Sequence, residues 1–375
     1  MKKLPTPCYL IDETKLHKNM EKLAAIKKQS GAKLLLALKC FAAWGIFDLM
    51  KPYMDGTTSS SYYEARLGYE TFGKETHAYS VAYSSEDIKK ISVFSDKIIF
   101  NSLSQLEQFY LECTNVTCGI RINPGVSYSH FDLADPARTF SRLGVTCITD
   151  IEAAMPMVSG AMVHFNCENE DVAAFEQMLA VISLKYETFL KQLDWISLGG
   201  GISYTEDHFN SQRFAQIIKN FSQKFGLQVY LEPGEATVAH TTHLVTTVLD
   251  IVENNKKIAI VDASIEAHML DLLIYRESAT FEKTIAQGEF LYQIAGRSCL
   301  AADIFGEGGF QNELQIGDTI MIKDAAGYTM VKKNWFNGLK MPSVAIRRTN
   351  GQIDLLQKSS YTDYKKSLST TELRI

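Results

Sequence analysis

The sequence predicts an α/β protein, in which a closed parallel barrel of eight strands is followed by an all-β domain. Short apolar runs recur through the first two thirds of the chain, and amphipathic helical patterns fall between most of them. After about residue 240 the helical patterns give way to short β-branched segments separated by Gly, Asn or Asp turns. A chain of 375 residues is long enough for two domains of ordinary size.

Eight apolar runs have the length and composition of buried strands, and they cover residues 33–40, 55–60, 77–82, 97–102, 118–123, 160–166, 195–200 and 227–233. Helices are expected at 15–29, 62–72, 85–94, 103–113, 172–193 and 212–224. This alternation favours a (β/α)8 barrel of the TIM type, in which functional groups collect at the C-terminal ends of the strands. A doubly wound open sheet is the alternative, but no GxGxxG motif follows the first strand.

The change in pattern predicts a barrel domain over residues 13–240 and a β-sandwich or β-barrel domain over 241–375. The extended start "TPCYLID" has the pattern of a strand, and the helix at 15–29 already precedes the first barrel strand. Residues 1–12 are therefore assigned to the second domain.

Composition limits the possible partners and the compartment. The formal charge of −5 argues against nucleic acid and suits a cationic substrate. No run approaches the roughly 20 apolar residues of a membrane helix, and Pro5 and Pro7 interrupt any signal peptide. The seven cysteines form no CxxC pair and are odd in number, which favours reduced thiols. We therefore expect a cytoplasmic protein with no membrane partner.

Four features end predicted strands: Lys39, His164, the glycines at 199–201 and Glu232. Each alone has an ordinary alternative, such as a surface lysine, a core histidine or a tight turn. Together, on one barrel rim, they suit pyridoxal 5'-phosphate. The lysine amine can bond its carbonyl carbon, glycine N–H groups can hold its phosphate, the imidazole can lie against its ring, and the acid can keep its pyridine nitrogen protonated.

Eight motifs stand in a recognisable order: "ALKC", "TSSSYYE", "RINPG", "VHFNCEN", "LGGG", "LEPGE", "GRSCLAAD" and "GYTMVKKNWFNG". In this order they resemble the barrel-type pyridoxal phosphate decarboxylases, the group that contains ornithine, arginine and diaminopimelate decarboxylases. The resemblance covers about residues 8 to 345. "LEPGEA" and "DASIEAHMLD" resemble the branch that decarboxylates carboxynorspermidine or carboxyspermidine in polyamine biosynthesis.

The resemblance implies roles for residues of both predicted domains. Lys39 would be the catalytic lysine that holds the cofactor, and Cys299 the general acid. Other cofactor contacts would be His164, Gly199, Gly200, Gly201, Glu232 and Tyr328. In relatives the positions of Cys299, Asp303 and Tyr328 belong to the second subunit, with Asp303 touching substrate, so the resemblance implies a homodimer with sites at the subunit interface.

The second acid of "LEPGEA" departs from ornithine and diaminopimelate decarboxylases, where an arginine follows "EPG". Glu235 stands there in this chain, and an acid would attract the ammonium groups of a polyamine substrate. Asp271 and Glu266 would complete an acidic clamp, although both also suit a solvated loop. Arg297 stands where relatives often have proline, and nothing in the sequence explains it.

Three other functions remain possible. Diaminopimelate decarboxylase is the nearest alternative, and Glu235 argues against it. An amino-acid racemase would need an uncharged or basic partner at the pyridine nitrogen, unlike Glu232, and a non-catalytic carrier would not need Cys299. The "HTTH" at 240–243 predicts no metal site, because residues three apart in a β-segment point to opposite faces.

Overall fold

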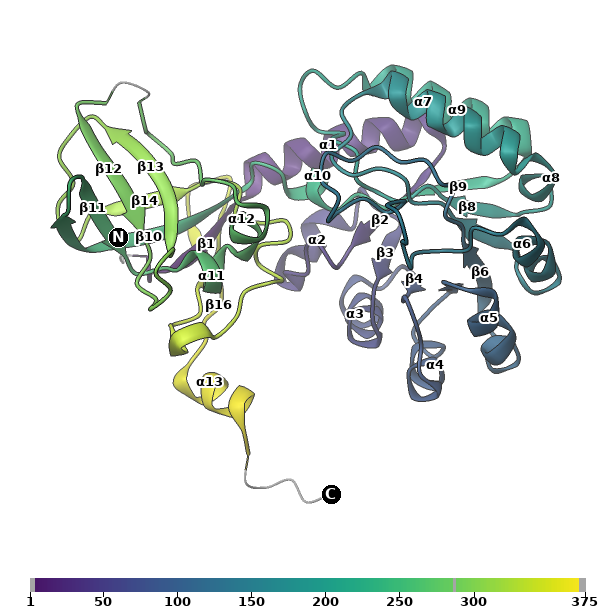
Figure 1. The fold of residues 1–375 in the computed structure, drawn as a ribbon, viewed down its shortest axis with the longest axis horizontal. Helices are drawn as coiled ribbons and strands as arrows, with labels where there is room; N and C mark the ends of the chain where they lie inside the picture. The colour runs from purple at the N-terminus through teal and green to yellow at the C-terminus, as the bar shows by residue number, and fades with distance from the viewer. Residues whose placement is uncertain (1–3, 286–287, 371–375) are drawn as a thin grey trace. The chain divides into compact units, whose positions relative to one another are not determined.

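The computed structural model describes residues 4–285 and 288–370, and it divides into two compact units. One unit is formed by residues 17–237 and the other by the two ends of the chain, up to Leu16 and from Val238 onward. The first is a closed parallel barrel and the second is built around a mixed sheet, as Figure 1 shows by the labelled strands. The predicted fold class is therefore confirmed.

All eight predicted barrel strands are present, and each is shorter than the apolar run that predicted it. They are β2 (Lys33–Ala37), β3 (Gly56–Ser59), β4 (Glu75–Tyr79), β5 (Lys97–Phe100), β6 (Thr117–Arg121), β7 (Gly160–Met162), β8 (Trp195–Ser197) and β9 (Gln228–Leu231). Neighbouring strands pair in parallel, and β2 closes the barrel on β9 through Lys33 opposite Tyr230 and Leu34 opposite Leu231. The polar ends of the predicted runs lie in the loops beyond the strands.

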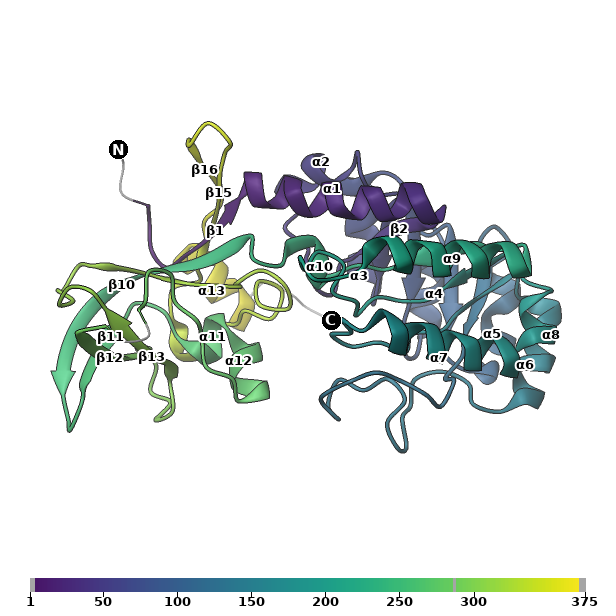
Figure 2. The ribbon, with the colours of Figure 1, turned by 90° about the horizontal axis from the view of Figure 1, so that it is seen from above.

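The predicted helices are also present, some of them divided. They are α1 (Glu13–Ser30), α3 (Tyr62–Leu67), α4 (Ser85–Ile91), α5 (Leu103–Phe109), α7 (Val172–Lys185) with α8 (Glu187–Leu190), and α9 (Ser211–Phe225). A π-turn at Gly68–Phe72 continues α3, and α7 ends at Tyr186, whose backbone leaves the helical region. Figures 1 and 2 both show α7 and α9 side by side on the outside of the barrel.

Three short barrel-unit helices were not predicted, namely α2 (Phe47–Met50), α6 (Ile148–Ala154) and α10 (Glu235–Val238). None exceeds two turns, so their hydrophobic periodicity is too short to recognise. Among the described helices, none combines the length and the apolar character needed to cross a membrane.

The second unit holds the strands β1 (Cys8–Asp12), β10 (Thr242–Glu253), β11 (Lys257–Val261), β12 (Phe290–Ala295), β13 (Ile304–Phe310), β14 (Thr319–Ile322), β15 (Ser343–Arg347) and β16 (Ile353–Gln357). The strand order is β13-β12-β11-β10-β1-β15-β16, with β14 also paired to β10. The N-terminal strand β1 lies between β10 and β15, antiparallel to the first and parallel to the second.

Beside its sheet, the described part of the second unit contains three short helices that were not predicted. They are α11 (Ile265–His268), α12 (Leu270–Tyr275) and α13 (Tyr361–Leu368). Side chains start two of them: the Ser264 hydroxyl accepts from the Ala267 N–H, and Ser360 forms a capping box with Asp363.

Side chains fill the barrel interior, so it contains a packed core and no pore. Leu35, Ile99, Met162, Trp195 and Tyr230 form this core. Gly160 makes room for Trp195, since a Cβ there would lie 2.0 Å from an indole carbon. A ligand must therefore bind at an end of the barrel.

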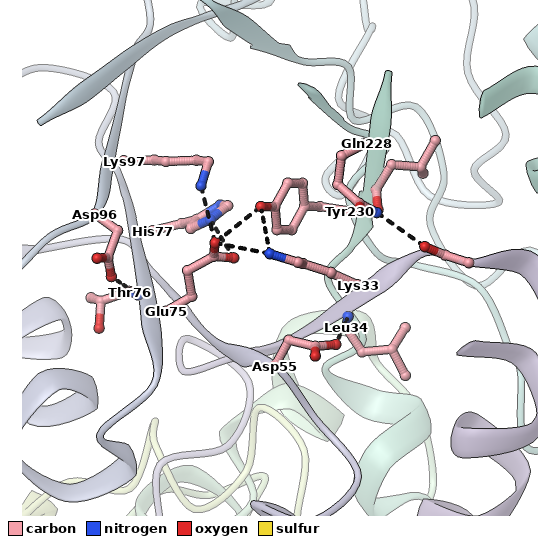
Figure 3. A network of polar contacts seen from close by, with 12 residues as sticks. Lys33, Leu34, Asp55, Glu75, Thr76, His77, Asp96, Lys97, Gln228 and Tyr230 are labelled. Atoms are coloured by element: carbon pink, nitrogen blue, oxygen red, sulfur yellow. Dashed lines mark hydrogen bonds and ion pairs between the residues drawn. The ribbon is translucent and has the colours of Figure 1, made fainter. Parts of the chain in front are cut away.

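The N-terminal end of the barrel carries a cluster of charged and aromatic residues, here named the base cluster: Lys33, Glu75, His77, Lys97 and Tyr230 (Figure 3). Both lysine Nζ atoms lie 3.2 Å from Oε1 of Glu75, and the Tyr230 hydroxyl donates to the same oxygen at 3.1 Å. The carboxylate thus joins β2, β4, β5 and β9, including the two strands that close the barrel.

Candidate active site

Polar side chains gather at the opposite, C-terminal end of the barrel, where each follows or ends a strand. Lys39 follows β2, His164 follows β7, and Glu232 follows β9. A cavity of about 410 Å³ lies here, and Lys39, His164, Tyr79 and Arg121 are among its lining residues. The structure therefore brings together the strand-end residues that the sequence predicted, on one rim.

Lys39 lies in a tight turn beyond β2. The turn is fixed by hydrogen bonds from the Leu38 N–H to the Thr58 carbonyl at 3.0 Å and from the Cys40 N–H to the Ala37 carbonyl at 3.0 Å. The side chain is open to the cavity but surrounded by protein. Burial lowers the pKa of the Lys39 amine, Glu232 opposes that shift, and the charge of Arg121 adds to it. A larger share of the amine is therefore neutral and nucleophilic than for a surface lysine.

Glu232 is the half-buried acid of the rim. Its Oε1 accepts a hydrogen bond from the Ser197 hydroxyl at 2.5 Å, and its N–H donates to the Gly199 carbonyl at 2.8 Å. Burial raises the pKa of the Glu232 carboxyl, while Ser197 and the positive charge of Lys39 oppose the shift. This carboxyl can hold or share a proton more readily than a surface glutamate.

The glycine triplet after β8 packs so closely that no other residue fits. Gly199 and Gly201 have φ of +72° and +75°, which disfavours side chains. A Cβ would lie 2.2 Å from Nδ1 of His164 at Gly199, 2.2 Å from the Glu232 carbonyl oxygen at Gly200, and 2.1 Å from the Asn166 carbonyl oxygen at Gly201. The triplet has no side chains of its own to cover its backbone N–H groups, as an anion cradle requires, and the Gly199 N–H donates to the Ser197 hydroxyl at 3.1 Å.

The His164 imidazole is neutral. Burial and the positive charges of Lys39 and Arg121 hold its pKa well below the usual range. Its enclosed Nδ1 has no hydrogen-bond partner among the described residues. A flat, uncharged ring beside the triplet suits stacking against an aromatic ligand better than proton transfer.

Two charged residues of the rim were not predicted. Arg121 ends β6, is only 5% exposed, and stacks its guanidinium 4.8 Å from the centre of the Tyr79 ring. Glu64 lies in α3 and accepts from the Ser60 N–H at 2.6 Å. Burial raises the pKa of Glu64, and Lys39 opposes that shift. Arg121 lies in the motif "RINPG" and Glu64 in the motif "TSSSYYE". The charged residues of these motifs were the sequence signal that could have identified both as rim residues.

Glu235 begins α10, one turn beyond Glu232, and unlike Glu232 it is exposed. Its Oε2 accepts a hydrogen bond from the Cys40 thiol at 3.5 Å. Both acids of "LEPGEA" therefore belong to the barrel unit, and they differ in burial.

The second unit carries the other predicted residues. Cys299 is exposed, and its N–H donates to Oδ1 of Asn337 at 2.6 Å. Asp303 is only 4% exposed, and its two oxygens accept from the N–H groups of Ile265 at 2.7 Å and Ser298 at 2.9 Å. Its carboxylate thus organises the backbone on which Cys299 lies, a role that the sequence did not suggest.

Asp271 and Glu266 lie on α12 and α11, so the alternative of a plain solvated loop was wrong. Asp271 forms an ion pair with Lys332. Burial raises the pKa of the Asp271 carboxyl, and Lys332 opposes that shift. The same Lys332 amine lies 5.2 Å from the centre of the Tyr328 ring, and the Glu266 carbonyl accepts from the Asn334 side chain at 2.9 Å.

Comparison with known proteins gives the family. Residues 8–326 match the model described as "Pyridoxal-dependent decarboxylase, C-terminal sheet domain". The chain belongs to this family. The pyridoxal-dependent decarboxylases therefore supply the reaction class, a decarboxylation, and the cofactor, pyridoxal phosphate.

Several pyridoxal-dependent decarboxylases resemble the whole chain. A carboxynorspermidine/carboxyspermidine decarboxylase of Herminiimonas arsenicoxydans is 52% identical, covering 98% of this chain and 100% of its own. A carboxyaminopropylagmatine decarboxylase of Synechocystis is 34% identical over 97% of this chain and 96% of its own. The crystal structure of carboxynorspermidine decarboxylase complexed with norspermidine, from Campylobacter jejuni, superposes with a TM-score of 0.91 at 36% identity, covering 97% of this chain and 100% of that one.

The rim of this pyridoxal-dependent decarboxylase fits its cofactor on geometric grounds. The three glycines exclude side chains where a phosphate needs backbone N–H groups, and the neutral His164 ring lies against Gly199. Lys39 and Glu232 supply an amine of lowered pKa and a carboxyl of raised pKa within the same group of charges. These residues therefore match the aldehyde, the phosphate and the pyridine nitrogen of the cofactor.

Proposed function

We propose that this enzyme decarboxylates carboxynorspermidine and carboxyspermidine, releasing CO2 and norspermidine or spermidine in polyamine biosynthesis. The observation that carries the proposal is Glu235, an exposed carboxylate one turn beyond the half-buried Glu232. A negative charge there attracts the ammonium groups of a polyamine and gives no partner for a substrate carboxylate. The names of the two relatives at 52% and 36% identity point to the same substrates.

The barrel residues would hold the cofactor and manage its protons. Lys39 would bond the carbonyl carbon through Nζ, Gly199, Gly200 and Gly201 would hold the phosphate, and His164 would lie against the ring. Glu232 would keep the pyridine nitrogen protonated, because a carboxylate beside it favours the charged pyridinium form. The cofactor supplies, when bound, a sink for the electron pair that departing CO2 leaves behind.

The second unit would complete the site in a homodimer. In this proposal Cys299 of the partner subunit delivers a proton to the substrate Cα, Tyr328 of the partner subunit contacts the phosphate, and Asp303 of the partner subunit acts near the substrate. The exposure of the Cys299 thiol supports such a role, because a proton donor must be reachable from outside its own unit. The seven unpaired thiols also support a reducing compartment, the cytoplasm.

Asp271 and Glu266 would add acidic groups for the distal ammonium of the substrate. The ion pair with Lys332 modifies this part of the proposal, since the lysine neutralises part of the charge of Asp271. Glu235 therefore carries the larger share of the attraction, and Asp271→Asn should raise KM less than Glu235→Gln.

The test compares the rates on four substrates with and without Glu235. Purified enzyme should turn over carboxyspermidine or carboxynorspermidine far better than diaminopimelate or carboxyaminopropylagmatine. Glu235→Gln should raise KM with kcat less affected, and Glu235→Arg should lower kcat/KM by roughly tenfold or more through charge repulsion. Glu187→Arg, a reversal of a partly exposed acid on α8 that pairs with Lys191, is the matched control and should change neither constant.

Two outcomes would contradict the proposal. One is a wild-type preference for diaminopimelate, which would place the enzyme with the relatives that bear arginine at this position. The other is a Glu235→Arg enzyme with unchanged kcat/KM on the polyamine substrates, which would remove Glu235 from substrate recognition.

A further inference from the structure

The thiol of Cys40 connects the turn that carries Lys39 to the turn that carries Glu235. Cys40 is fully buried, and its Sγ donates to Oε2 of Glu235 at 3.5 Å, an ordinary length for sulfur. The mechanism proposed above gives no role to this cysteine.

The backbone on both sides of the thiol is fixed. The Ala37 N–H donates to the Pro233 carbonyl at 3.1 Å, and the Thr237 N–H and hydroxyl donate to the Gly234 carbonyl at 3.0 and 2.6 Å. Gly234 packs directly on the cysteine, because a Cβ there would lie 2.7 Å from that of Cys40. The Sγ atom therefore occupies a defined place beside the first residue of α10.

The contact limits the rotation of the Glu235 side chain. Glu235 is exposed at the start of a helix of only four residues, and a glutamate side chain loses rotamer entropy when it binds a cation. A carboxylate already held in one orientation loses less. Restraint of Glu235 thus strengthens binding of the ammonium group that it attracts.

The chemistry of the thiol suits this task. A thiol is a weak neutral donor, so it can orient a carboxylate without cancelling its charge. A lysine or arginine at the same place would neutralise the charge on which polyamine attraction depends. We propose that Cys40 is a positioning residue for Glu235 and thereby sets the affinity for the cationic substrate, an inference that rests on the proposed function.

Kinetics of two variants test the positioning role. Cys40→Ala should raise KM for carboxyspermidine about three- to tenfold, within the range for losing one ordinary hydrogen bond because a thiol is a weak donor, with kcat and the cofactor absorbance little changed. Cys40→Ser keeps a donor and should recover most of the lost affinity. Cys113→Ala removes another buried thiol of the barrel unit and should leave KM unchanged.

A double-mutant cycle then separates positioning from packing. In a Glu235→Gln background, Cys40→Ala should have little further effect on KM, since the group that it positions is already altered. An equal rise in KM in both backgrounds would overturn the proposal. So would loss of the cofactor absorbance in Cys40→Ala, which would show that the residue serves the Lys39 turn instead.

A spectroscopic readout keeps this inference separate from the choice of substrate. The infrared S–H stretch that disappears in Cys40→Ala should shift in Glu235→Gln, because a neutral amide is a weaker acceptor than a carboxylate. An S–H band at an unchanged frequency in Glu235→Gln would show that Cys40 does not donate a hydrogen bond to Glu235. If the band shifts but wild-type enzyme ignores both carboxylated polyamines, the contact stands and the proposed function is wrong.

Discussion

Both ends of the barrel carry lysine and glutamate side chains. Among the described residues, these form ion pairs with each other at the N-terminal end, whereas Lys39 and Glu232 at the C-terminal rim do not. In the base cluster, Glu75 accepts from Lys33, Lys97 and Tyr230, and every one of these partners belongs to the barrel. At the rim, Lys39 and Glu232 interact through their charges but form no ion pair with each other among the described residues. Lys33, Lys97 and Tyr230 surround one oxygen of the Glu75 carboxylate, whereas Glu232 is half-buried and accepts from the Ser197 hydroxyl.

The pKa directions follow this difference. Burial alone would raise the pKa of Glu75, but His77, Lys97 and Lys33 outweigh it and hold that pKa well below the usual range. At Glu232 the effect of burial is larger than the opposing hydrogen bonds and positive charges, so the pKa of this carboxyl is raised. A paired acid stabilises the fold, whereas an acid held near its neutral form is available for chemistry, so we assign the base cluster to stability and the rim to catalysis.

The largest difference should come from Lys39 and Lys33, two lysines at opposite ends of the barrel. Lys39→Ala should lower kcat by at least about 10³-fold, because it would remove the amine proposed to hold the cofactor. Lys33→Ala is the matched control at the other end and should leave kcat nearly unchanged while lowering the urea midpoint. Comparable losses of kcat in both variants would remove the distinction between the two ends.

The two glutamates should separate activity from stability. Glu232→Gln should lower kcat by roughly 10²-fold or more with the free energy of unfolding kept or increased, since a buried charge is relieved. Glu75→Gln should lower the free energy of unfolding by roughly 2 kcal/mol, discounted because Lys33 is 40% exposed, and spare kcat. Urea unfolding and steady-state kinetics on both proteins check this, and a reversed pattern would contradict it.

The rim, unlike the base cluster, is expected to be incomplete within one chain. Cys299→Ala should bind cofactor but lose roughly 10²-fold in kcat, the range for a positioned proton donor. Mixing it with Lys39→Ala protein should restore some activity, because a hybrid dimer rebuilds one intact site. No recovery, with subunit exchange verified by mass, would mean that each site is formed by a single chain.

The smallest expected effect is the pH dependence of stability. Glu75 has a lowered pKa, so its contribution is present above the ordinary value of about 4.5 and is lost as the pH falls through its folded pKa. His77, buried and neutral, has a lowered pKa too, so its contribution is lost as the pH falls below about 6.5. Wild-type enzyme should therefore lose stability on acidification, and Glu75→Gln should lose less below about pH 4.5. Parallel curves for the two proteins would contradict the assignment.

The barrel and much of its rim could be predicted because each strand is a short apolar run and each of Lys39, His164 and Glu232 terminates one. Arg121 and Glu64 were missed, since a single charged residue at a strand end or in a helix looks like a surface residue. The base cluster was missed for a different reason. Lys33, Glu75 and Lys97 each begin a strand, and only closure of the barrel brings them together.

The second unit was harder to predict from its sequence. "IEAHMLDLLIY" is apolar and short, so its pattern did not distinguish the helices α11 and α12 from strands. The pairing of Asp271 with Lys332 spans sixty-one residues of sequence and leaves no local signal. The contacts of the Asp303 carboxylate with backbone N–H groups likewise leave no local signal in the sequence.

The most direct test of the account is to find which lysine holds the cofactor. Borohydride treatment of the purified yellow protein, followed by digestion and mass spectrometry, should place the reduced cofactor on Lys39 alone. Lys33 and Lys97 also face the barrel interior, and they serve as internal controls that should carry no label. Label on either of them, or on no lysine at all, would contradict the claim that the rim is the reaction site.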